Sequence, residues 1–177
     1  MSDKPSFIGL LNAIAVGESR GYELFKAWSG ATENAELKSV LDMVAIREHE
    51  HAAAFTKRLC ELGFGIREKP SESFSQQLKL AGSDLSDKKK FKQILQISNN
   101  SRDGNDPFGK IFEDTSIDPQ TGSLLGRYIA EERDSGRCLQ AAYDALKGRK
   151  EDSVLKDVAE RLDRLSDELE ELKSLRS

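Results

Sequence analysis

Four long stretches of this chain repeat apolar residues with the period of an α-helix, and this pattern constrains the fold more than any other feature. The stretches have end signals of their own, with Pro5 at the first start, Gly30 and Gly63 after the first two ends, and Asp118-Pro119 before the third. We expect helices over residues 5–29, 33–62, 119–147 and 153–176. Helices of about 24 to 30 residues are about 36 to 45 Å long, and such helices pack best side by side.

The connections predict how these helices are arranged. A few residues around Gly30 join the first pair, and residues 148–150 join the second pair, so each pair should form an antiparallel hairpin. Residues 63–118 are too many for a simple loop, and we expect short helices near 73–80 and 83–96. The chain of 177 residues is thus predicted to be a single all-α domain, a four-helix bundle of two hairpins joined by a long, partly helical crossover.

Charge and composition exclude several classes of protein. The 27 Lys and Arg residues and 31 Asp and Glu residues give a net charge of −4, so there is no basic surplus to bind the phosphates of nucleic acid. No apolar run approaches the roughly 20 residues that cross a membrane, and the N-terminus lacks the pattern of a signal peptide. Cys60 and Cys138 are too few for a disulfide scaffold. We expect a cytoplasmic protein that binds neither nucleic acid nor membrane.

Three glutamates, Glu18, Glu48 and Glu132, lie at the centres of apolar helical stripes, where the core should be. A buried carboxylate costs several kcal/mol unless it is paired, protonated or bound to a metal. The only cation near these stripes is Arg161, at the edge of the fourth. His51 follows Glu48 by three residues, so both side chains can reach one point in the core, whereas the intervening residues project toward the flank and solvent. Together these four residues predict a metal site.

The same residues resemble the motifs of a known family. Gly17-Glu18-Ser19, followed by aromatic residues, resembles the first-helix motif of rubrerythrins and other ferritin-like di-iron carboxylate proteins. Glu48-His49-Glu50-His51-Ala52 resembles their second-helix E-x-x-H-A motif, and the segment 130–135, which contains Glu132, is similar to the third-helix motif. The resemblance covers the four bundle helices and not residues 63–118. It implies a ferritin-like bundle that holds two irons.

The fourth helix departs from the family pattern. The family has a second E-x-x-H there, whereas this chain has Glu168-Leu169-Glu170-Glu171 and no histidine after His51. Alignment by the motif puts Glu168 at the Glu position and Glu171 at the His position. Alignment by the apolar stripe puts Leu165 at the Glu position and Glu168 at the His position. Both alternatives stay open, and so does a solvent-exposed position for either glutamate.

The resemblance implies an oxidase or peroxidase that acts on dioxygen or peroxide, in oxidative-stress defence or iron homeostasis. Because the chain has no C-x-x-C of a rubredoxin domain, electrons would come from an external donor. Oxygen ligands with one imidazole favour iron or manganese, although zinc is not excluded. The candidate ligands are Glu18, Glu48, His51, Glu132 and Glu168, and the candidates for further ligands or for hydrogen-bond partners of the ligands are Glu171, Glu131, Tyr22 and Tyr128.

Two other functions stay open. One is an iron-storage protein with ferroxidase activity. The other is a metal-free helical interaction module. In this case Glu18, Glu48 and Glu132 lie at a hydrated interface between helices or pair with Arg161, and His51 is an ordinary core histidine. The exposed helical faces also allow a homodimer.

Overall fold

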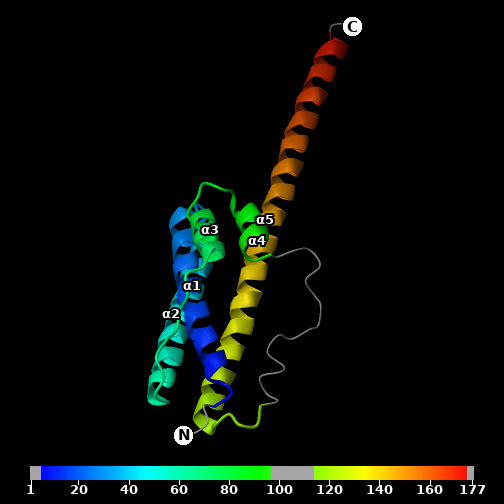
Figure 1. Cartoon of the computed structure of the whole chain (residues 1–177). Coiled ribbons are helices and arrows are strands. Elements are labelled where there is room, and N and C mark those ends of the chain that lie inside the picture. The colour runs from blue at the N-terminus through cyan, green and yellow to red at the C-terminus, as the bar shows by residue number, and fades with distance from the viewer. Residues whose placement is uncertain (1–4, 97–113, 175–177) are drawn as a thin grey trace. The chain divides into compact units, whose positions relative to one another are not determined.

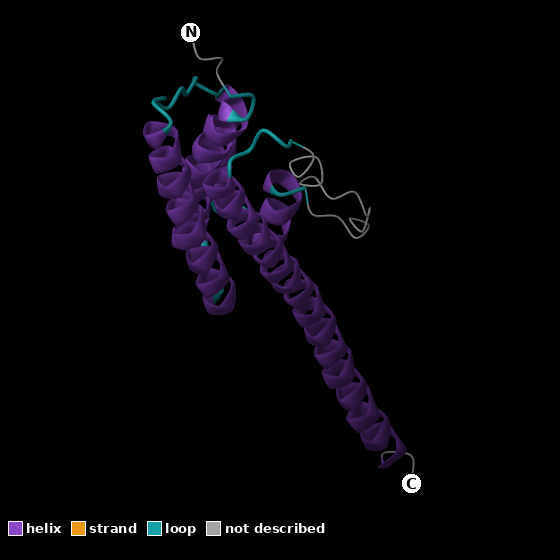
Figure 2. Ribbon diagram, turned by 90° about the horizontal axis from the view of Figure 1, so that it is seen from below, coloured by secondary structure: helices purple, strands orange, loops and turns teal. Residues whose placement is uncertain are grey.

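The computed structural model describes residues 5–96 and 114–174, and it describes side chains as far as residue 148. This part of the chain has helices and no strand, which confirms the all-α class (Figures 1 and 2). The helices are α1 (Ile8–Ala31), α2 (Ala35–Glu61), α3 (Glu72–Ala81), α4 (Asp87–Ile94) and α5 (Pro119–Ser174). The chain divides into two compact units, residues 1–140 and 141–177. No helix in the described residues has a stretch long and apolar enough to cross a membrane.

Helices α1 and α2 form an antiparallel hairpin, as the short link near Gly30 predicts (Figure 1). Asn34 starts α2, because its side-chain oxygen accepts hydrogen bonds from the backbone N–H groups of residues 36 and 37, each at 3.1 Å. Ser29 near the end of α1 donates to Asp42 in α2 at 2.7 Å. The hairpin therefore brings the middle of α1 beside the second half of α2.

The first part of α5, residues 119–140, packs against this hairpin in the first unit. The shared core contains Leu11 and Ile14 from α1, Phe55 and Leu59 from α2, and Leu125, Tyr128 and Ile129 from α5. Asp118 caps α5 through the backbone N–H of Thr121 at 3.0 Å. Arg58 of α2 donates to Asp118 at 2.9 Å, so the cap also ties α5 to α2. Three helices thereby surround one apolar interior.

The crossover contains helices α3 and α4 near the two positions that the sequence predicts. Helix α4 contacts α1 through Trp28, whose indole N–H donates to Asp87 at 2.7 Å and whose ring packs edge-on against Phe91. Lys90 is buried and donates to the carbonyl of Ala81 at the end of α3, at 2.8 Å. Residues 97–113 of the predicted crossover lie outside the described residues.

Helix α5 corrects the sequence prediction of two helices over 119–147 and 153–176. The structure has one continuous helix from Pro119 to Ser174, and the turn expected at residues 148–150 is absent. A glycine inside a helix costs only about 1 kcal/mol relative to alanine, and the Lys and Arg residues beside Gly148 favour helix. With no proline nearby, Gly148 is insufficient to end the helix, and the capping residues near Ser153 are not used as a helix start.

Candidate metal centre

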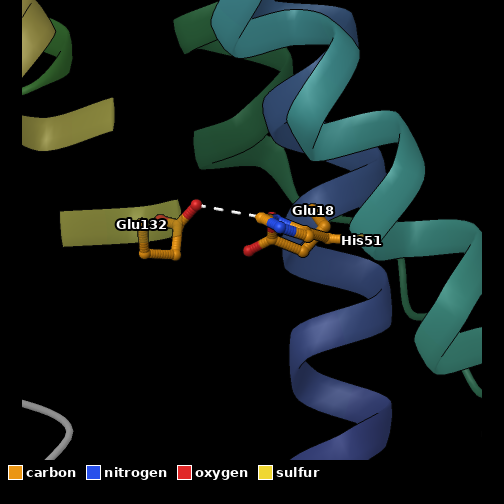
Figure 3. Close-up of side chains that lie close together, drawn as sticks. All are labelled: Glu18, His51 and Glu132. Carbon is orange, nitrogen blue, oxygen red and sulfur yellow. Dashed lines mark hydrogen bonds and ion pairs between the residues drawn. The ribbon is translucent and has the colours of Figure 1, made fainter. Parts of the chain in front are cut away.

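Four of the five predicted metal ligands lie together in the first unit. Glu18 comes from α1, Glu48 and His51 from α2, and Glu132 from α5. Figure 3 shows Glu18, His51 and Glu132. The ligand atoms of Glu18, His51 and Glu132 all lie within 4.8 Å of one another. Glu18, Glu48 and His51 are 6%, 8% and 4% exposed, so the helices do force these polar groups inward. The cluster is therefore a buried group of carboxylates around one imidazole.

Both ring nitrogens of His51 face carboxylates. Nδ1 lies 3.1 Å from an oxygen of Glu18 and 3.7 Å from an oxygen of Glu132, whereas Nε2 lies 2.7 Å from an oxygen of Glu131. Burial lowers the pKa of His51, but its hydrogen bonds to Glu18 and Glu131 outweigh burial and raise it. Nδ1 is thus the nitrogen directed at the other candidate ligands, and Nε2 is held from outside the cluster.

Glu18 accepts hydrogen bonds from several sides. Its Oε2 faces His51, and its Oε1 accepts a hydrogen bond from the phenol of Tyr128 at 3.0 Å. The Tyr128 ring also packs edge-on against the imidazole of His51, with ring centroids 5.1 Å apart. Tyr128 therefore fixes the positions of one carboxylate and of the histidine, as a hydrogen-bond partner of metal ligands would.

Burial and like charge shift the pKa values of the other two carboxyl groups. Burial, together with the charges of Glu18 and Glu132, raises the pKa of Glu48 to about 10. Burial and the charge of Glu18 raise the pKa of Glu132 to about 7. Oε1 of Glu132 is buried and has no hydrogen-bond partner, which is rare for a carboxylate oxygen in a folded protein. The cluster therefore has a shortage of positive charge.

Gly21 makes room for Glu48. A Cβ atom at this position would clash with Oε2 of Glu48 and lie 2.8 Å from its Cδ, so any larger residue would displace the carboxylate. Gly21 follows Glu18 by three residues and thus lies one turn along the same face of α1. The sequence analysis did not identify this residue, although its spacing from Glu18 was a signal.

Two of the candidate partners of the ligands, Tyr22 and Glu131, differ in what they contact. Tyr22 is half-buried and lies against the exposed ring of His49, with ring centroids 4.9 Å apart. Glu131 is 27% exposed on its side chain and contacts the candidate ligand His51 directly. The Arg127–Glu131 pair, at helix spacing i, i+4 and 2.9 Å apart, was the available signal for this role.

Glu168, Glu171 and Arg161 lie in the part of α5 whose side chains are not described. They belong to the second unit, so their relation to the cluster is untested.

Comparisons with protein-family models, with curated proteins and with solved structures find no match to this chain. The chemistry of the site therefore rests on the geometry of its own residues.

Proposed function

We propose that Glu18, Glu48, His51 and Glu132 bind a redox-active transition metal, and that the protein is a ferritin-like di-metal carboxylate oxidase or peroxidase. The observation that carries this proposal is the buried carboxylate and imidazole cluster, in which Oε1 of Glu132 accepts no hydrogen bond and lies 3.7 Å from Nδ1 of His51. Within the described residues, no Lys or Arg ion pair reaches its three carboxylates. Three carboxylates and one imidazole suit iron or manganese better than zinc. A bound iron would supply electron transfer to dioxygen or peroxide.

The charges of the cluster fit one divalent cation. Without a metal, Glu48 keeps its proton at pH 7, because its pKa is about 10, and Glu132, with a pKa of about 7, is about half protonated. A divalent cation that binds both groups as carboxylates displaces these protons. The proposal therefore predicts the release of more than one proton for each ion bound near pH 7. Calorimetry in buffers of different ionisation enthalpy measures that number.

Glu131 and Tyr128, outside the ligand set, would hold the ligands in place, and Arg127 would support Glu131. Glu131 accepts a hydrogen bond from Nε2 of His51, so Nδ1 is left to face Glu18 and Glu132. Arg127 pairs with the other oxygen of Glu131 at 2.9 Å and keeps that carboxylate ionised. Tyr128 orients Glu18 through its hydroxyl. These residues would position the ligands and would not bind the metal themselves.

The proposal also includes a second metal ion and a fourth helix that would complete the bundle around the cluster. Since the cluster balances one divalent cation, a second ion needs further carboxylates, and Glu168 is the first candidate. In a four-helix arrangement, residues 153–174 of a second copy in a homodimer would supply that side, because α5 continues without a turn to Ser174. A Glu168→Gln variant that binds one ion fewer than the wild type would support this part. A Glu168→Gln variant with unchanged stoichiometry would refute the role of Glu168 alone.

The tetrapeptide Glu48-His49-Glu50-His51 offers a matched test of the site. Glu48→Ala with His51→Ala should abolish the binding of Fe²⁺ or Co²⁺, because both side chains belong to the cluster. His49→Ala with Glu50→Ala removes the same residue types from exposed positions and should leave binding intact. Metal content by elemental analysis and circular dichroism of all three proteins separate loss of the ligands from loss of the fold. Full metal content in the first double variant would refute the assignment.

A metal-free helical module is the second candidate, because His51 has a hydrogen-bonded partner on each ring nitrogen without any ion. The same metal titration separates the candidates. A protein that stays empty at millimolar Fe²⁺, Mn²⁺ and Co²⁺ favours the metal-free module.

A further inference from the structure

A pocket of about 320 Å³ lies beside the cluster, between α2 and the first part of α5. Its lining includes His51 and Tyr128, which are buried and contact Glu18, together with Ala54 of α2. The volume is that of several water molecules. The pocket therefore connects the outside of the helices to the imidazole of the cluster.

The lining of this pocket carries one carboxylate, Glu50, and one guanidinium, Arg127, and the carboxylate of Glu131 lies beside it, paired with Arg127. Arg127 lies 2.9 Å from Glu131 and 3.7 Å from Glu50, and the side chains of Arg127 and Glu50 are mostly exposed. Exposed ion pairs of this kind contribute less than about 1 kcal/mol, so Arg127 can leave its partners at little cost. Glu131 also contacts His51 at 2.7 Å, so it links the pocket lining to the cluster.

We infer that this pocket is the port through which divalent cations reach the cluster, with Glu50 and Glu131 as the carboxylates that receive them. The inference rests on the proposed metal site. Glu50 in the lining and Glu131 beside it together outnumber the single positive charge of Arg127, so this region attracts cations and repels anions. Arg127 would release Glu131 to a cation as its new counter-ion, and Glu131 is already in contact with His51.

A second pocket, of about 530 Å³, supplies the control. It lies between α1 and α2, its lining includes Ala15, Val16 and Ala52, and it contains none of the four residues of the cluster. Ala52 and Ala54 are both half-buried positions of α2, two residues apart. Ala54→Leu fills the port, and Ala52→Leu makes the same chemical change in the other pocket.

Stopped-flow measurement of Co²⁺ binding to the full chain, followed by the cobalt absorption bands, tests the port. Ala54→Leu should slow association and dissociation equally, by about tenfold, with the equilibrium affinity unchanged, because a port alters only the barrier. Ala52→Leu should bind at the wild-type rate. Glu50→Gln should slow association and reduce its dependence on salt.

Equal association rates for Ala54→Leu, Glu50→Gln and the wild type would overturn the port while leaving the metal site in place. If circular dichroism shows that Ala54→Leu does not fold, the association rate of Glu50→Gln, a substitution at an exposed position, tests the port instead. Absence of Co²⁺ binding to the wild-type chain would overturn the proposed function, and the port with it.

Discussion

Replacing Glu48 by glutamine should stabilise the metal-free protein and weaken the metal-bound one. In the metal-free fold, burial and the charges of Glu18 and Glu132 keep Glu48 protonated, with a pKa of about 10. Glutamine has nearly the same shape and can still donate a hydrogen bond to Glu18. The substitution thus removes an ionisable group and keeps its packing.

The expected size of this effect follows from the pKa. The ordinary value is 4.5, and each pKa unit corresponds to about 1.4 kcal/mol, so protonating Glu48 at pH 7 costs the fold about 3 kcal/mol. Because the folded pKa is raised, the stability of the wild type is complete below pH 4.5 and is lost as the pH rises toward 10. Glu48→Gln should therefore equal the wild type near pH 4.5 and exceed it by about 3 kcal/mol at pH 7.

Urea unfolding in the presence of a chelator, at several pH values from 4.5 to 8, measures this difference. Glu50→Gln is the control, since the Glu50 side chain is 57% exposed and its replacement should not change the pH dependence. With Mn²⁺ at about a hundred times its dissociation constant, the wild type should gain about 2.7 kcal/mol and the variant much less. Parallel pH profiles for wild type and Glu48→Gln would refute the reasoning, because Glu48 would then titrate as an exposed carboxyl group does.

Three further predictions concern other parts of the first unit. Gly21→Ala should lower metal affinity at least tenfold, because the added methyl group displaces Glu48. Gly17→Ala is the control: a Cβ at this position has open space, so the substitution should raise helix stability by up to about 1 kcal/mol and leave metal affinity unchanged. Metal titration and thermal unfolding check both variants. Asp118→Ala should cost about 1 to 2 kcal/mol, because it removes the cap of α5 and a partner of Arg58. The Thr121 hydrogen bonds lower the pKa of Asp118 to about 2, so the wild-type advantage should be present above pH 3.8 and disappear in acid unfolding as the pH falls toward 2. A chelator should lower the melting temperature of metal-loaded protein, and equal melting temperatures with and without chelator would contradict a bound metal.

Helical periodicity was sufficient to predict the elements of the first unit and the inward direction of its polar residues. Glu18 and Glu48 are buried because each lies among apolar residues on one face of its helix. When those apolar residues pack into the core, the glutamate between them is carried inward as well. The same reasoning placed His49 and Glu50 on the outside, where they are. It was wrong at residues 148–150, because a glycine between strong helix formers is a weak stop signal.

The sequence by itself determined that three carboxylates and one histidine would point toward the core, since the helix period fixes each to an apolar face. Glu18, Glu48 and His51 are buried there, and Glu132 is half-buried. Only the tertiary structure decided which atoms meet: Nδ1 of His51 faces Glu18 and Glu132, and Nε2 faces Glu131. It also decided that the Glu48 carboxylate occupies the space that a side chain at residue 21 would fill. Periodicity fixes the face of one helix, whereas the approach of two helices, and hence any distance across them, depends on how side chains from both fill the space between.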